Sequence, residues 1–404
     1  MKRLLSITGG LLGLLVLGAL AVALALTFGG LRKGAEPVSQ VFQSPIETPP
    51  QPPYPPPGTP TPPQPGTPTA VPTPPGLRAE NIRIEKEVQL TFEGPNSIFS
   101  NIAWSPQSDA ILVSKPNGRT IETGTATYLL GDLWLIPLDG TAPRKLAVNA
   151  NWGEWSKGGQ WIAYGSLTGP TTQEVYTMRG DGSSALKVAD ADRAPVGWLP
   201  SNEIAYVHHG ELWVAGPRQE NPRAILPTLG LESSRDDTFR LSPAGQHLAY
   251  LRQSTLLLIK MGTAQPIEVT NTLISNRGYQ PDLAWSRDDR WLVYIERSGS
   301  VEQLRVVNTD SMRASTVYAA EGFHLRRPSW IPSSQVIIFS GYPRGAETFD
   351  CCAKVFAINA DGTGLNDLTG DQIPQQYPEI SPDSTKVAFF RAGNLWVGFL
   401  NTGR

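Results

Sequence analysis

The chain has 404 residues, a formal net charge of −2 and a sequence pI near 6.1. Its 34 basic residues are scattered, so they form no run of positive charge of the kind that nucleic acid binding requires. The sequence also has no His-Glu-x-x-His or Gly-x-Ser-x-Gly motif. Composition and motifs therefore argue against a nucleic acid partner and against the common metalloprotease and serine hydrolase classes.

Residues 4–30 are almost wholly apolar and contain no charged residue. A helix of this length spans about 40 Å, whereas the apolar core of a bilayer is about 30 Å thick. The alternative is a cleaved signal peptide, because Ala-x-Ala sites occur at residues 21–23 and 23–25. Those sites lie inside the apolar run, which is longer than a usual signal sequence core. We therefore predict an N-terminal transmembrane anchor over residues 1–33, with a signal peptide as the alternative.

The charges that flank this anchor predict its orientation. Lys2 and Arg3 precede the apolar run, and Arg32 and Lys33 follow it. The terminal amine adds one positive charge on the N-terminal side, which favours an N-terminus inside the cell. The rest of the chain is then expected outside the cytoplasm, in a periplasm or at the cell surface.

A proline-rich stretch lies within residues 34–80, between the anchor and the remainder of the chain. Between Pro45 and Pro75, 16 of 31 residues are proline. Such a sequence forms neither helix nor sheet, and in polyproline II geometry it reaches up to roughly 100 Å. It could also be a PxxP ligand for a partner domain, but it lacks basic flanks, so we predict a disordered stalk.

From about residue 81 to the C-terminus, one phrase recurs seven times: a Trp-Ser-Pro-like turn followed by polar residues and an apolar strand. The copies begin at Trp104, Trp155, Trp198, Leu241, Trp285, Trp330 and Ile380, so they are 43 to 51 residues apart. A period in the forties indicates a stacked supersecondary unit. Further strand-like runs and Asp-Gly turns, such as Asp139-Gly140 and Asp361-Gly362, complete a four-stranded meander in each unit. This organisation is typical of a β-propeller.

The seventh unit lacks a fourth strand, because the sequence ends at Arg404. Residues 88–92, which precede the first copy, resemble the fourth strand of the sixth unit. An open ring would expose sheet edges, so we expect this N-terminal strand to complete the last blade. The predicted fold of residues 81–404 is all-β, a seven-bladed β-propeller of four-stranded blades closed by an N-terminal strand.

The repeats resemble those of the TolB-like propellers, which are related to the WD-type repeat. The resemblance is carried by the phrases AWSPQSDAILV, EWSKGGQWIAY, AWSRDDRWLVY and EISPDSTKVAF, and it covers roughly residues 85–404. The chain departs from the pattern in having Leu241 and Ile380 in place of Trp, and seven copies where TolB has six blades. The resemblance implies the fold, and a TolB-like role in a cell envelope complex follows only by analogy.

Few residues carry recognisable chemistry. Cys351 and Cys352 are adjacent, and they could form a vicinal disulfide or remain free thiols; two cysteines alone cannot make a zinc site. The His208-His209 pair precedes a glycine and is interpreted as a solvated turn rather than a metal site. We therefore predict no metal and no cofactor.

Topology predicts the face on which a ligand binds. In a four-stranded blade, the loops before the first strand and between the second and third strands emerge on one face, and binding sites commonly lie on such loops. Blades one and six carry long insertions there, residues 114–132 and 341–352, whereas blade seven has a short loop, which predicts a notch. The candidate ligand-binding residues on this face are Tyr377, Gln376, His324, Arg326, Arg327, Trp152, Arg277 and Tyr279.

These features predict a membrane-anchored, non-catalytic binding or scaffold module for a protein or glycan partner outside the cytoplasm. The alternative is a carbohydrate-active lyase or hydrolase that uses the same face, since some propellers with this type of repeat are such enzymes. A lyase needs a base and groups that neutralise charge, for which His324, Arg326 and Arg327 are the candidates.

Overall fold

The computed structural model describes residues 76–93, 100–123, 126–169, 173–192, 195–226, 238–252, 254–263, 265–272, 282–345, 352–370 and 376–402. The predicted anchor and the proline-rich stretch through residue 75 lie outside these ranges and stay predictions. No helix among the described residues is long and apolar enough to cross a membrane.

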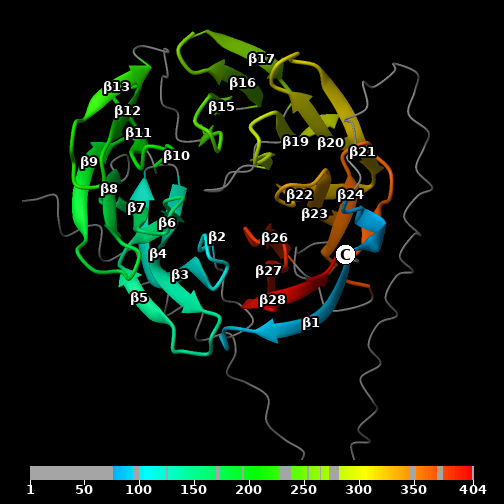
Figure 1. Ribbon diagram of the computed structural model, residues 1–404, viewed down its shortest axis with the longest axis horizontal. Coiled ribbons are helices and arrows are strands. Elements are labelled where there is room, and N and C mark those ends of the chain that lie inside the picture. The colour runs from blue at the N-terminus through cyan, green and yellow to red at the C-terminus, as the bar shows by residue number, and fades with distance from the viewer. Residues whose placement is uncertain are drawn as a thin grey trace, which may run out of the picture. The chain divides into compact units, whose positions relative to one another are not determined.

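The described residues form seven antiparallel sheets of four strands, arranged as blades around a common centre (Figure 1). The first strands line the centre and are β2 (Ser100–Trp104), β6 (Ala150–Trp155), β10 (Gly197–Trp198), β14 (Thr238–Leu241), β18 (Leu283–Trp285), β22 (Phe323–Trp330) and β26 (Gln376–Ile380). The second strands are β3 (Ala110–Thr123), β7 (Trp161–Leu167), β11 (Ile204–His208), β15 (His247–Arg252), β19 (Trp291–Ser298), β23 (Val336–Pro343) and β27 (Lys386–Arg391). The predicted seven-bladed propeller is confirmed.

The outer half of each blade completes the meander. The third strands are β4 (Ala126–Pro137), β8 (Gln173–Arg179), β12 (Glu211–Ala215), β16 (Thr255–Lys260), β20 (Val301–Asn308), β24 (Lys354–Asn359) and β28 (Asn394–Asn401). The outer strands are β5 (Arg144–Ala147), β9 (Leu186–Ala191), β13 (Arg223–Leu226), β17 (Pro266–Thr270), β21 (Ala314–Glu321), β25 (Asn366–Asp367) and, in blade seven, β1 (Arg83–Gln89).

The N-terminal strand closes the ring, as predicted, but it begins earlier than the predicted residues 88–92 and spans Arg83–Gln89. β1 pairs with β28 from Arg83 opposite Asn401 to Gln89 opposite Trp396, and Figure 1 shows the blue strand beside the red one. A short 3-10 helix, η1 (Ala79–Asn81), precedes it. Leu77 and Ala79, which fall within the predicted stalk, are buried with residues of blades six and seven.

The apolar core lies between the blades. Seven clusters of buried side chains occur in the described residues, and each one joins two neighbouring blades. In one, for example, Val293 and Leu304 of blade five pack with Trp330 and Ile337 of blade six. This explains why the repeated strands are apolar on both faces: each sheet is covered on both sides by its neighbours.

The repeated tryptophan also ties one blade to the previous one through a hydrogen bond. The indole N–H of Trp330 donates to the carbonyl of Ala284 at 3.1 Å, and Trp285 donates to Arg240 at 3.1 Å. Trp198 donates to Glu154 at 3.2 Å, and Trp104 donates to Glu379 at 2.9 Å, across the point where the ring closes. Four of the five tryptophan copies therefore link neighbouring blades by a hydrogen bond, whereas the indole N–H of Trp155 has no hydrogen-bond partner among the described residues.

The insertion predicted as a loop in blade one is largely a hairpin. β3 and β4 stay paired from Ala110 opposite Pro137 out to Thr123 opposite Ala126, with one irregularity after Pro116. Gly118, Arg119, Thr120 and Glu122 in the outer part of this hairpin are exposed, whereas Ile111, Leu112 and Val113 at its inner end are buried, which explains why the segment is polar and not apolar on both faces. The prediction that residues 114–132 form a loop is therefore wrong, because most of them belong to the paired strands β3 and β4.

Candidate binding site at one end of the ring centre

The polar residues before the first strand of blade six meet the hairpin of blade five. β19 and β20 are joined by a turn at residues 299–300, and β22 begins on the same face of the propeller. Glu302, at the start of β20, is completely buried there. A carboxylate so placed must be neutralised or hydrogen-bonded, because burial of an isolated charge is costly.

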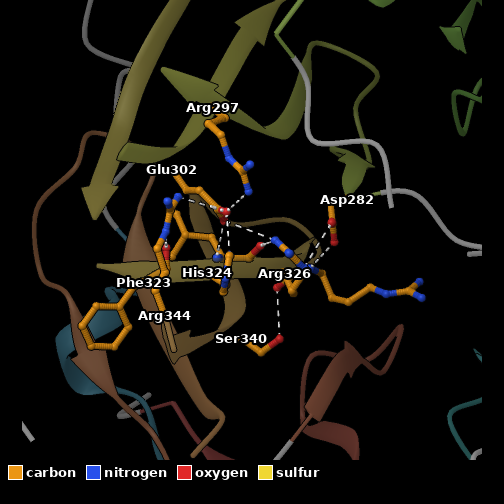
Figure 2. A network of polar contacts seen from close by, with 10 residues as sticks. Asp282, Arg297, Glu302, Phe323, His324, Arg326, Ser340 and Arg344 are labelled. Atoms are coloured by element: carbon orange, nitrogen blue, oxygen red, sulfur yellow. Dashed lines mark hydrogen bonds and ion pairs between the residues drawn. The ribbon is translucent and has the colours of Figure 1, made fainter. Parts of the chain in front are cut away.

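Four basic side chains surround the Glu302 carboxylate (Figure 2). Its Oε1 lies 2.8 Å from His324 Nδ1, 2.9 Å from an Arg297 Nη and 3.4 Å from an Arg344 Nη. Its Oε2 accepts hydrogen bonds from the backbone N–H of Leu325 at 2.8 Å and from Arg326 at 3.2 Å. Burial by itself would raise the pKa of Glu302, but these hydrogen bonds and the nearby cations outweigh it and lower the pKa below 4.5.

A second buried acid lies beside Arg326. Asp282 has no exposed surface, and its Oδ1 accepts a hydrogen bond from the backbone N–H of Arg327 at 2.8 Å. Its Oδ2 has no hydrogen bond and lies 3.9 Å from Nε of Arg326. Burial raises the pKa of Asp282, and the charges of Arg326 and Arg327 oppose that rise. We refer to Asp282, Arg297, Glu302, His324, Arg326 and Arg344 as the mouth cluster.

Arg327 and Tyr377 continue the cluster toward the centre of the ring. The guanidinium of Arg327 lies 4.8 Å from the centre of the Tyr377 ring, which makes an edge-on contact with Phe390. Both residues adopt positive φ, 52° and 55°, at equivalent bulges of β22 and β26. Side chains as large as these are rarely found there, and such backbone strain costs about 1–3 kcal/mol and is concentrated at functional sites.

The structure thus brings together His324, Arg326, Arg327 and Tyr377 from the predicted set, and Gln376 lies next to Tyr377 at the start of β26. Trp152 differs: it is 3% exposed and belongs to the apolar cluster between blades two and three, so its indole fills the core instead of facing a ligand. Arg277, Tyr279 and Cys351 lie outside the described residues. Cys352 is half-buried and takes part in a disulfide. Its pairing with Cys351, the only other cysteine in the sequence, stays a prediction.

Glu302, Arg297 and Arg344 are not among the residues predicted from the sequence. They come from the turns between second and third strands, and their charges are separated in the sequence from those of β22. A pair of oppositely charged residues flanking a tight turn, Arg297 and Glu302, was the available signal. No group of three or more His, Cys, Asp or Glu side chains suited to a metal occurs in the described part of the chain.

One surface cavity in the described part of the chain lies away from the mouth cluster. It has a volume of about 420 Å³ and lies between β9 and blade three, where Tyr206, His208 and Trp213 line it. It contains none of the predicted ligand-binding residues. The predicted notch near Tyr377 therefore stays a prediction.

No protein-family model and no curated protein matches the chain. Solved structures do share its fold. A chain described as part of the Mitotic Checkpoint Complex has a TM-score of 0.54 at 14% identity, covering 89% of this chain and 98% of that chain. Oligogalacturonate lyase from Vibrio parahaemolyticus has a TM-score of 0.52 at 10% identity, covering 78% and 93%. Putative TolB from Agrobacterium tumefaciens has a TM-score of 0.42 at 17% identity, covering 76% and 90%.

Identities this low show the fold alone. The chain is a β-propeller protein, and TolB proteins are among the solved structures that it matches. These propellers include both enzymes and proteins that are not described as enzymes, so the comparison does not assign an activity.

Proposed function

We propose that the chain is a non-catalytic binding module that uses the mouth cluster to hold an acidic, chain-like ligand outside the cytoplasm, while residues 4–30 anchor it in a membrane. The observation that carries this proposal is the charge of the cluster. Among the described residues, the three arginines of the mouth cluster face two carboxylates, those of Asp282 and Glu302, so positive charge is in excess in this part of the mouth.

The excess charge is accessible to a ligand. The side chain of Arg297 is 45% exposed and that of Arg344 is 27% exposed, although both reach the buried Glu302. A guanidinium that is held in place by a buried carboxylate still has N–H groups to donate to an incoming acid group. Tyr342 adds an aromatic surface, with the His324 ring at 4.9 Å. An acidic sugar or peptide chain would place its carboxylates on the guanidinium groups of Arg297 and Arg344 and its apolar parts on the Tyr342 ring.

The test measures binding of the detergent-solubilised full chain to oligogalacturonate, to oligoglutamate and to uncharged oligomers of the same lengths. We expect binding to one acidic series, and the series that binds identifies the source of the acid groups. Replacing Arg297 and Arg344 with Gln should weaken this binding about tenfold or more, because charge-assisted hydrogen bonds are lost. Arg144→Gln with Arg223→Gln, which removes the same charge elsewhere, is the control. Equal binding by both double variants would contradict the proposal.

A second candidate is a lyase, which the position of His324 favours. Its imidazole is paired with a buried carboxylate and lies beside Arg326 and Arg344, as a base near groups that neutralise a substrate acid would. Incubation with oligogalacturonate separates the two candidates. A lyase forms unsaturated ends that absorb ultraviolet light, whereas a binding module returns the oligomer unchanged.

A further inference from the structure

The sequence Ile-Ala-Tyr occurs in the second strands of blades two and three, where it ends at Tyr164 and Tyr206. In blade two the Tyr164 ring stacks on that of its cross-strand neighbour Tyr176, with ring centres 5.1 Å apart. The equivalent neighbour in blade three is Trp213, which instead makes an edge-on contact with His208 at 5.9 Å. Tyr206 makes no ring contact with a described residue and lines the cavity of about 420 Å³ between β9 and blade three. Blade three thus leaves open a space that the neighbouring blade fills with a stacked ring.

The hydroxyl of Tyr206 has no partner in the described part of the protein. The residue is only 3% exposed, yet its hydroxyl makes no hydrogen bond with a described residue. The hydroxyl is not sealed in the core, so it opens to the cavity that its side chain lines. A phenol hydroxyl can both donate and accept a hydrogen bond. It is therefore available to a ligand that enters the cavity.

The aromatic wall of the cavity is held in place before any ligand enters. The indole N–H of Trp213 donates to Oε2 of Glu211 at 3.1 Å, and the His208 ring meets the indole at an angle of 87°. Cross-strand neighbours share one face of a sheet, as do residues two apart on a strand, so Tyr206, His208 and Trp213 all face β9. A flat ligand can pack on this wall without rearranging it.

The opposite rim of the cavity is polar and carries compensated charge. Lys187 on β9 pairs with Glu174 at 2.6 Å and with Asp190 at 2.8 Å, which leaves one ammonium N–H to donate. The side chain of Asp190 is 73% exposed, and its second oxygen can still accept. The side-chain amide of Gln219 makes no hydrogen bond with a described residue. Donors and acceptors are thus both present, and there is no excess of positive charge to attract an acid.

The loop between β12 and β13 forms a further wall, and it is attached to blade two. The hydroxyl of the buried Thr177, on β8, donates to the carbonyl of Pro217 in this loop. A second cavity, of about 290 Å³, is lined by Leu186 and Arg218, which adjoin lining residues of the first cavity in sequence. Two cavities therefore lie close together between the same two blades, with room for more than one unit of a chain.

We propose that these cavities bind a neutral glycan chain, with one pyranose ring packed on Trp213. The apolar C–H face of a pyranose packs against an aromatic ring. Its hydroxyl groups both donate and accept, as do the groups around the cavity, those of Tyr206, Lys187, Asp190 and Gln219. The volume of the first cavity falls within the range of about 300–1,000 Å³ that is usual for ligand pockets. Because this site shares no residue with the mouth cluster, it is additional to the proposed function.

The test titrates the full chain with neutral tetrasaccharides of glucose, mannose, galactose and N-acetylglucosamine, followed by saturation-transfer NMR in a detergent without a sugar headgroup. We expect at least one tetrasaccharide to bind, and to bind more tightly than its monosaccharide. Tyr206→Phe should weaken this binding about two- to tenfold, because one neutral hydrogen bond is lost. It should leave the melting temperature unchanged, because the hydroxyl has no partner in the protein. Trp213→Ala should abolish binding.

Matched controls separate this site from others. Tyr164→Phe makes the same change at the equivalent position of blade two and should bind like the wild type. Arg297→Gln with Arg344→Gln should also bind the neutral glycan like the wild type, whereas binding of an acidic oligomer at the mouth cluster depends on these arginines. Failure of the proposed function is therefore distinct from failure of this inference.

Three results overturn the inference. One is that no tetrasaccharide in the series binds, and another is that Tyr206→Phe binds as tightly as the wild type. The third is that decaproline, tested in the same way, binds with the dependence on Tyr206 and Trp213 while the sugars do not, because the groove would then recognise a peptide.

Discussion

Arg326 illustrates how single residues support the mouth cluster. Its guanidinium reaches both buried acids, at 3.2 Å from Glu302 and 3.9 Å from Asp282, and its side chain is 13% exposed. Removing one partner of a buried ion pair leaves an uncompensated charge, which costs about 3–5 kcal/mol. By contrast, the side chain of Arg297 is 45% exposed, so water can take the place of its guanidinium beside Glu302 when it is removed.

We therefore predict that Arg326→Ala lowers the free energy of unfolding by about 3–5 kcal/mol, whereas Arg297→Ala changes it by less than about 1 kcal/mol. Chemical denaturation of both variants beside the wild type measures the difference. Similar losses for the two would show that Arg326 does not neutralise the buried acids. This also limits the use of Arg326 variants in binding assays, because loss of the fold would be mistaken for loss of the site.

Glu154 and Glu379, on the first strands β6 and β26, predict an unusual dependence of stability on pH. Their folded pKa of about 7 exceeds the ordinary 4.5, so the folded chain binds more protons than the unfolded chain between these values. Stability should then fall as the pH rises through that window, by roughly 1.4 kcal/mol per pKa unit and group. Glu302, whose pKa is lowered, acts in the opposite direction and only below about 4.5.

Unfolding by urea at several pH values between 4.5 and 7 tests this. The wild type should lose stability with rising pH, and Glu154→Gln with Glu379→Gln should lose much less. A wild-type profile that is flat or rises over this window would contradict the assigned burial of the two carboxyls.

At the scale of elements, the repeated Trp is the feature that the sequence reveals best. Its spacing predicted the blades and their number, because each copy marks the same turn of the same meander. Its indole hydrogen bond could not be foreseen, since the acceptor belongs to the previous blade. The same holds for the candidate site: His324, Arg326, Arg327 and Tyr377 were found by their place before first strands. The role of Glu302 could not be predicted, because it depends on which residues of neighbouring blades face each other.

Replacement of Trp330 separates the two roles of this residue. Trp330 is 5% exposed, packs between blades five and six, and donates to Ala284. Trp330→Phe keeps most of the packing and loses the hydrogen bond, for an expected cost of about 1 kcal/mol beyond the smaller ring. Trp330→Ala also opens a cavity, for about 3–5 kcal/mol. Guanidinium denaturation measures the free energy of unfolding of both variants. Equal losses of this free energy would mean that packing of the indole contributes nothing beyond the hydrogen bond.

For the whole molecule, closure of the ring joins the two ends of the propeller sequence. Arg391, whose side chain is 6% exposed, pairs with Glu87 at 2.7 Å, and Asn394 Oδ1 accepts a hydrogen bond from the hydroxyl of Thr91 at 3.3 Å. Blade seven has three strands from the C-terminal end and one from the N-terminal end. Loss of β1 would expose the edge of β28 and the apolar residues between blades six and seven.

Three N-terminal truncations test this closure. Deletion through Gly76 removes no residue of the propeller core, so the melting temperature should match that of the full chain. Deletion through Ile82 keeps β1 but removes Leu77, Ala79 and Ile82 from the cluster shared by blades six and seven, so an intermediate loss is expected. Deletion through Phe92 removes β1 itself and should lower the melting temperature most and favour association through the open edge of β28. If this shortest chain has the same melting temperature as the full chain and stays monomeric, the N-terminal strand does not hold the ring closed.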